Sequence, residues 1–147
     1  YIQVYEQTTE AFCKGNYGVK FADAALRMGM IYENGTCANE AVPLYAYTFY
    51  LQALYAIRLR LKNYDDYGDR TVERNIMKSV YRMKSLLKDE VRQDEIHYQR
   101  PYIIRNYMKK GIRRCKVYMQ LVPGEFLEEE VARVYKNLDL FRKHKMI

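Results

Sequence analysis

Residues 26–35, LRMGMIYENG, place a glycine inside a helical pattern and end that pattern on Asn-Gly. The apolar residues around this segment recur at the three-and-four spacing that is typical of one buried helix face. They are Phe21, Ala25, Met28, Ile31 and Tyr32. Gly29 lowers helix stability by roughly 1 kcal/mol relative to alanine, so a compensating contact is expected. We predict that Gly29 packs closely against a second helix and that Gly35 ends the first one.

The same periodicity predicts helices along almost the whole chain, and no segment alternates with period two as a strand would. The six expected helices cover residues 2–14, 19–33, 40–62, 69–91, 102–121 and 125–143. The third is apolar on most of its surface, which predicts that it lies at the centre of the domain. The polar, turn-rich residues 63–69 predict a boundary or a long connection. A chain of 147 residues that is 49% hydrophobic predicts an all-α domain with a substantial core.

Residues 21–53 also resemble a Sel1-like repeat, a relative of the tetratricopeptide repeat. The positions that carry the resemblance are Ala22, Ala25, Leu26, Gly29, Tyr32, Gly35, Ala41, Tyr50 and Ala53. The resemblance implies antiparallel helix hairpins stacked as a short α-solenoid. Residues 1–62 would form the repeat region, and residues 63–147 would add degenerate repeats or capping helices to one continuous domain. No clean second copy is present, so a helical bundle with one repeat-like hairpin is the alternative.

The sequence lacks the short motifs of phosphate-binding loops, dinucleotide-binding folds, zinc proteases and serine hydrolases. Asp94, Glu95 and His97 are close enough in sequence to suggest a metal or acid–base cluster, but this spacing is common by chance. The three cysteines share no C-x-x-C spacing and are expected to be free, buried thiols in a reducing compartment: Cys13, Cys37 and Cys115. We therefore expect no enzymatic activity, no cofactor and no metal.

The formal net charge of +7 is unevenly distributed. Residues 1–61 hold five basic and five acidic side chains, whereas residues 62–147 hold twenty and thirteen. Within the fifth helix, basic residues follow one face at spacings of three and four: Arg105, Lys109, Arg113 and Lys116. A solvated outer face is the simpler interpretation of this basic stripe, and an acidic ligand is the functional one.

The resemblance implies a non-enzymatic scaffold that binds a segment of a partner protein or peptide in a helical groove, and the basic stripe adds an acidic segment as the functional expectation. The expected contacts are Tyr47 and Tyr50 of the third helix together with the basic stripe. The alternative is a basic helical domain that binds nucleic acid or another polyanion through residues 100–116. No apolar window is long enough to predict a membrane span. The chain opens on Tyr1 without a signal-like segment, so we expect a trimmed chain and a cytoplasmic location.

Overall fold

The computed structural model describes residues 2–36, 40–64, 67–97, 100–121 and 128–146, with the backbone alone for Tyr67, Met119 and residues 128–135. This part of the chain is all-α and contains seven helices. They are α1 (Ile2–Cys13), α2 (Val19–Asn34), α3 (Pro43–Asn63), α4 (Tyr67–Leu86), α5 (Lys88–Val91), α6 (Pro101–Leu121) and α7 (Glu128–Lys143). None of these described helices carries an apolar stretch long enough to cross a membrane.

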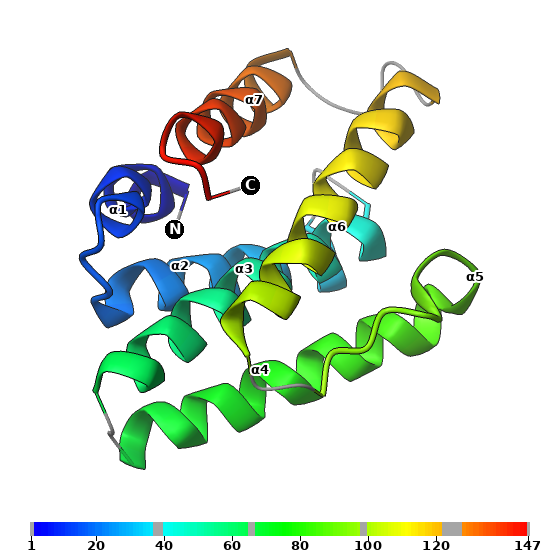
Figure 1. Cartoon of the computed structure of the whole chain (residues 1–147). Helices are drawn as coiled ribbons and strands as arrows, with labels where there is room; N and C mark the ends of the chain where they lie inside the picture. Colours follow the sequence, from blue (N-terminus) through cyan, green and yellow to red (C-terminus); the bar gives the residue numbers. More distant parts are fainter. Residues whose placement is uncertain (1, 37–39, 65–66, 98–99, 122–127, 147) are drawn as a thin grey trace.

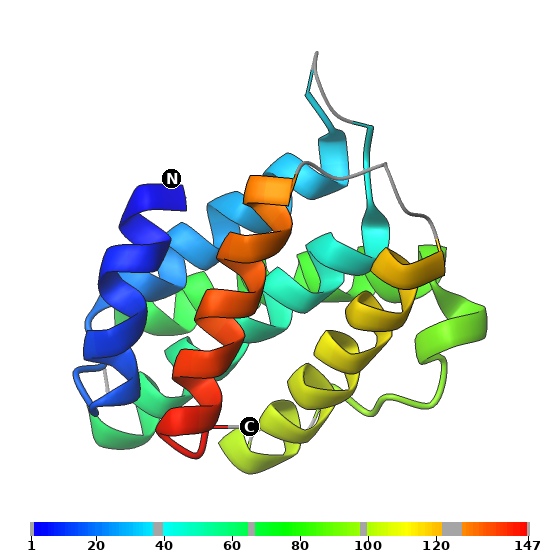
Figure 2. The same ribbon diagram turned by 90° about the horizontal axis from the view of Figure 1, so that it is seen from above.

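Neighbouring helices pack as sequential antiparallel pairs: α1 contacts α2, α2 contacts α3, and α3 contacts α4. The chain then returns, because α6 packs on α3 and α7 packs on α1. Figure 1 shows α2, α3 and α4 side by side, and the view from above shows α1, α7 and α6 in a row across them (Figure 2). Two layers of helices therefore enclose the core.

The third helix is the centre of this arrangement, as the sequence predicts. Every side chain from Leu44 to Arg58 is buried, on all sides of α3. A helix that is buried on all sides has no solvent-facing side, so its sequence is apolar all round rather than amphipathic. Burial of its many aromatic and aliphatic side chains supplies the main driving force for packing the other helices around it.

The predicted notch at Gly29 is confirmed. A Cβ atom at this position would lie 2.5 Å from Cε1 of Tyr50, well inside van der Waals contact. The glycine therefore lets the α2 backbone rest against the buried Tyr50 ring of α3. The predicted helix end is confirmed as well, because Gly35 has a φ of 74° and donates its N–H to the carbonyl of Ile31 at 2.8 Å.

The prediction of one continuous helix over residues 69–91 is wrong. The helix is divided at Leu87, whose φ of −107° and ψ of 27° depart from helical values. Leu87 and Val91 are both buried, and Ile96 beyond them is fully buried. The break redirects the chain so that these apolar side chains reach the core and Asp94 reaches the interface of α3 with α6.

Candidate functional site

The two tyrosines predicted to contact a partner lie in the core. Tyr47 and Tyr50 are both 0% exposed. The Tyr47 hydroxyl donates to Oδ2 of Asp94 at 2.8 Å, and the Tyr50 hydroxyl donates to Oε1 of Glu33 at 2.5 Å. Burial, followed by the neighbouring carboxylate, raises the pKa of each phenol, so both stay protonated donors at neutral pH. The structure places neither ring on a surface, and we exclude both from the candidate site.

An arginine completes each of these buried contacts. Arg82 donates to both carboxylate oxygens of Glu33 at 2.9 Å, and Arg114 donates to Oδ2 of Asp94 at 2.9 Å. The hydrogen bonds from Arg82 hold the pKa of Glu33 below its ordinary value. These two carboxylates therefore stabilise the fold rather than serve an open site.

Asp94 is engaged by protein groups, not gathered with His97 for a metal. Its carboxylate meets Tyr47 and Arg114, its carbonyl accepts a hydrogen bond from Lys84, and the His97 side chain is exposed. Across the residues that the structure describes, no group of three or more His, Cys, Asp or Glu side chains is placed to hold a metal ion. The sequence cluster at 94–97 thus separates in three dimensions.

The cysteines of the described residues are free thiols in sheltered positions. Cys115 is buried and Cys13 is half-buried. Burial raises the pKa of Cys115 to about 12 and that of Cys13 to about 11. Since the thiolate is the reactive form, neither is suited to act as a nucleophile at neutral pH. Cys37 lies outside the described residues.

The predicted basic stripe of α6 is divided by the packing. Arg105 is half-buried beside Tyr55 of α3. Lys116 is half-buried at a pocket of about 40 Å³ lined by α1, α3, α6 and α7. Lys109 and Arg113 are exposed at a separate surface hollow of about 450 Å³. The other described residues of that hollow are Glu95, Ile103, Asn106, Tyr107 and Lys110. The four stripe residues therefore do not form one contact surface.

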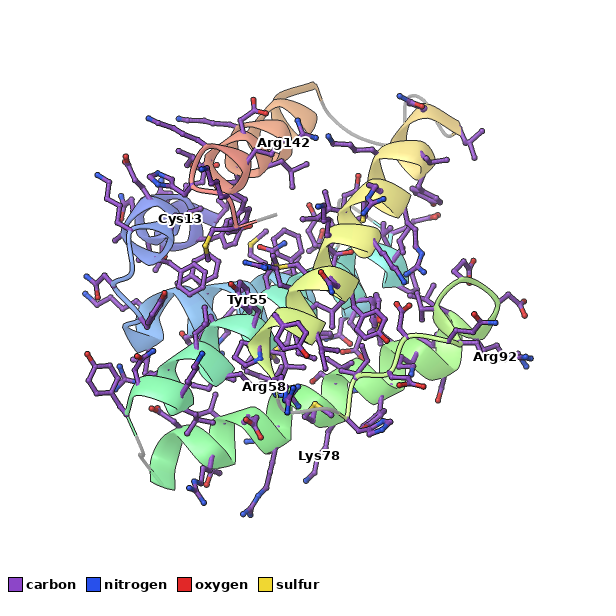
Figure 3. The ribbon with its side chains drawn as sticks, in the orientation of Figure 1. Cys13, Tyr55, Arg58, Lys78, Arg92 and Arg142 are labelled. Carbon is purple, nitrogen blue, oxygen red and sulfur yellow. The ribbon has the colours of Figure 1, made fainter. Side chains whose placement is uncertain are left out.

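A different and more basic site lies where the end of α3, the first half of α4 and the start of α6 meet. This basic groove has a volume of about 690 Å³. Its described lining residues are Arg58, Leu61, Lys62, Arg70, Glu73, Arg74, Arg100, Pro101 and Tyr102. Five of them carry a positive charge and one carries a negative charge. Figure 3 labels Arg58 at this junction of helices.

The cations of the basic groove come from separate walls. Arg58 and Lys62 are one turn apart on α3, and Arg70 and Arg74 are one turn apart on α4. Arg100, directly before α6, is the fifth. Positive charges on several walls direct their fields into the space between them, where an anion would interact with all of them.

Arg58 is the most deeply placed of these cations. Its side chain is only 3% exposed, and its Nε lies 3.7 Å from Oε2 of Glu73. Its Nη1 donates to the carbonyl of Ile96 at 3.3 Å, and its Nη2 contacts the sulfur of Met77 at 3.2 Å. Burial lowers the pKa of this guanidinium, although Glu73 acts in the opposite direction. The protein therefore holds a guanidinium in a fixed position at the edge of the groove.

Sequence reasoning missed the basic groove, although one signal was present. Basic residues recur every four positions along α4: Arg70, Arg74, Lys78 and Arg82. Each step of four advances about 40° beyond a full turn, so the stripe rotates around the helix. Arg70 and Arg74 line the groove, Lys78 projects away from the body of the protein (Figure 3), and Arg82 reaches Glu33 of α2.

Comparisons of the chain with protein-family models, with curated proteins and with solved structures each found no match. The function must therefore be argued from the chemistry of the basic groove itself.

Proposed function

We propose that the protein is a non-enzymatic helical interaction module that binds an acidic segment of a partner protein in the basic groove. The observation that carries this proposal is the charge of the groove, where five cations face one carboxylate among the described residues. Like charges brought together in one groove repel each other, and an acidic ligand relieves that repulsion. Charge complementarity of this kind also steers a ligand to its site before contact is made.

The resemblance of residues 21–53 to a Sel1-like repeat supports a role in protein binding. The close α2–α3 hairpin, with Gly29 against Tyr50, has the small-residue contact that the resemblance implies. The groove lies at the other end of the domain's helical pairs, where α3 and α4 present their charged turns. In this proposal the hairpin provides rigidity and the groove provides recognition.

A protein segment suits the basic groove better than a nucleic acid does. Nonspecific binding of single strands uses a long basic path together with aromatic side chains on which successive bases stack. Tyr102, which is 50% exposed, is the aromatic side chain among the groove's described residues, so the groove offers no series of stacking platforms there. Lys109, Lys110 and Arg113 belong to the separate surface hollow beside α6. The nucleic-acid alternative assigns the contact to residues 100–116, and these three are the exposed basic residues of that region outside the groove.

Fluorescence anisotropy with a labelled Glu-rich peptide tests the proposal. Lys62→Glu with Arg74→Glu reverses two exposed charges of the groove, and we expect the affinity to fall by at least about tenfold. Lys78→Glu with Arg92→Glu is the matched control, because it makes the same change of net charge at exposed positions outside the groove. Equal weakening in both variants, or no binding by the unchanged protein, would contradict the proposal.

An oligonucleotide of the same net charge as the peptide provides the second arm. We expect it to bind more weakly than the peptide and to lose no more affinity on the Lys62 and Arg74 reversals than on the matched reversals of Lys78 and Arg92. Tighter binding of the oligonucleotide, lost on reversal of Lys109 and Arg113 and falling steeply with salt, would instead establish the nucleic-acid function.

A further inference from the structure

We infer that the basic groove recognises a phosphorylated side chain within the acidic segment, a conclusion that rests on the proposed function. Four of its five cations are arginines: Arg58, Arg70, Arg74 and Arg100. The planar guanidinium presents its N–H donors as a fork that matches two oxygens of a phosphate, whereas a lysine acts as a point charge. The same fork also matches a carboxylate, so the preference for phosphate rests on the greater charge and the larger number of acceptor oxygens of a phosphorylated side chain.

The charge balance of the groove fits a phosphate monoester. Five cations and the single carboxylate of Glu73 leave an excess of four positive charges among the described lining residues. A carboxylate neutralises one of them, whereas a phosphorylated side chain carries about −1.5 to −2 at neutral pH and offers three acceptor oxygens. One phosphate with acidic neighbours in the same segment therefore complements the groove.

Arg58 adds a fixed positive charge beside the space for such a group. It is held by Glu73, Ile96 and Met77, so its guanidinium loses little conformational freedom when a ligand arrives. Its shielding from water also strengthens any charge interaction that it makes. The start of α6, at Pro101 and Tyr102, adds the positive end of a helix dipole to the same groove.

The dimensions of the groove favour a segment over a free anion. A volume of about 690 Å³ is much larger than one phosphate group and leaves room for flanking residues. Tyr102 provides a half-exposed ring at the edge for their apolar atoms. The cations also lie on two helices and before a third, which suits a ligand that extends beyond its phosphate.

Titration calorimetry with three peptides of one acidic sequence, differing at a single position that holds Ser, Glu or phosphoserine, tests the inference. We expect phosphoserine to bind at least about tenfold more tightly than Glu at pH 7.5. The advantage should shrink toward pH 5.5, because the phosphate takes up its second proton near pH 6. Glutamate keeps its charge over most of this range, which makes the Glu peptide the internal control.

Arg74→Lys with Arg100→Lys keeps the charge of the groove and removes two guanidinium forks. We expect these variants to lose more affinity for the phosphoserine peptide than for the Glu peptide, because the phosphate offers three acceptor oxygens to the forks and the carboxylate offers two. Arg92→Lys is the control outside the groove and should alter neither affinity. Thermal unfolding of all variants by circular dichroism checks that they remain folded.

The outcomes separate the inference from the proposed function. Equal affinity for the Glu and phosphoserine peptides would overturn the inference and leave acidic-segment binding intact. Failure of every peptide to bind would overturn both. Displacement of the phosphoserine peptide by inorganic phosphate at the concentration at which an unlabelled peptide displaces it would show that the groove takes the free anion, and would overturn the assignment to a segment.

Discussion

The central helix α3 makes two buried contacts of the same design with different neighbours. Toward α2 and α4, Tyr50 donates to Glu33, which Arg82 also binds. Toward α6, Tyr47 donates to Asp94, which Arg114 also binds. In each contact a phenol and an arginine from different helices share one carboxylate, so three parts of the chain are joined at a single acidic side chain.

A glycine accompanies each contact, and here the two sides differ. At Gly29 a Cβ atom would lie 2.5 Å from the Tyr50 ring, whereas at Gly111 it would lie 3.0 Å from the Thr48 hydroxyl oxygen. The carboxylates differ in the opposite sense, since the Glu33 side chain is 16% exposed and that of Asp94 is 3% exposed. The helix backbone therefore packs more closely on the α2 side, whereas the shared carboxylate is more deeply buried on the α6 side.

Asp94→Asn should have the largest effect, because it removes the negative charge between a buried phenol and the Arg114 guanidinium. We expect the free energy of unfolding to fall by about 3 kcal/mol, the range for breaking a buried pair from one side. Urea denaturation measures the loss. Asp139→Asn removes the partner of Arg142 in an exposed pair and should cost less than about 0.5 kcal/mol. Similar losses in both variants would show that the burial of Asp94 contributes nothing.

Gly29→Ala should come next, with a loss of about 2 kcal/mol from overpacking against the Tyr50 ring. This loss is expected although alanine improves helix propensity by about 1 kcal/mol. Combining the change with Tyr50→Leu, which removes the ring, should make the alanine markedly less costly than it is alone. Additive losses in this double-mutant cycle would argue against a direct clash.

Glu33→Gln should have a smaller effect that depends on pH. The hydrogen bonds from Arg82 lower the pKa of Glu33 in the folded protein, so its contribution is present above the ordinary value of 4.5 and is lost as pH falls through the folded value. We expect a loss of about 1 kcal/mol near neutral pH, because Arg82 is partly exposed. The difference between variant and wild type, followed by denaturation at several pH values, should shrink as the pH is lowered below 4.5. A difference that grows on acidification would contradict this assignment.

Gly111→Ala should have the smallest effect. The Thr48 hydroxyl must yield by a few tenths of an ångström, and the gain of about 1 kcal/mol in helix propensity offsets that strain. We expect thermal unfolding to shift by no more than a few degrees in either direction. A loss larger than that of Gly29→Ala would reverse the order of the two glycine contacts.

Much of the fold could be predicted from local pattern. The continuous apolar surface of α3 predicts its central position, and Gly29 predicts a close helix pair. Both predictions hold because the residues of a single helix show which of its faces another helix must cover. The break at Leu87 could not be predicted in this way. Residues 69–91 keep helical periodicity across the break. The change of direction at Leu87 accompanies the burial of Val91 and Ile96 in the core, which depends on distant helices.

The candidate site was much less predictable than the fold. The regular spacing of four basic residues along α6 predicts one basic face. In the structure, however, Arg105 is half-buried against α3, and Lys116 is half-buried at the pocket beside α7. From sequence alone, Tyr47 and Tyr50 are plausible surface contacts. The structure shows instead that their hydroxyls donate to Asp94 and Glu33 in the core. Spacing along one helix does not reveal what the neighbouring helices cover.

The sequence by itself determined the helical class, the central helix, the tight α2–α3 contact and the positive charge of the second half of the chain. Only the tertiary structure decided which charges meet. Arg58, Arg74 and Arg100 are separated by many residues and share a groove because the chain turns back after α5 and begins α6 beside α3. Helix formation depends on neighbours within a few residues, whereas a groove depends on side chains that long-range packing brings together.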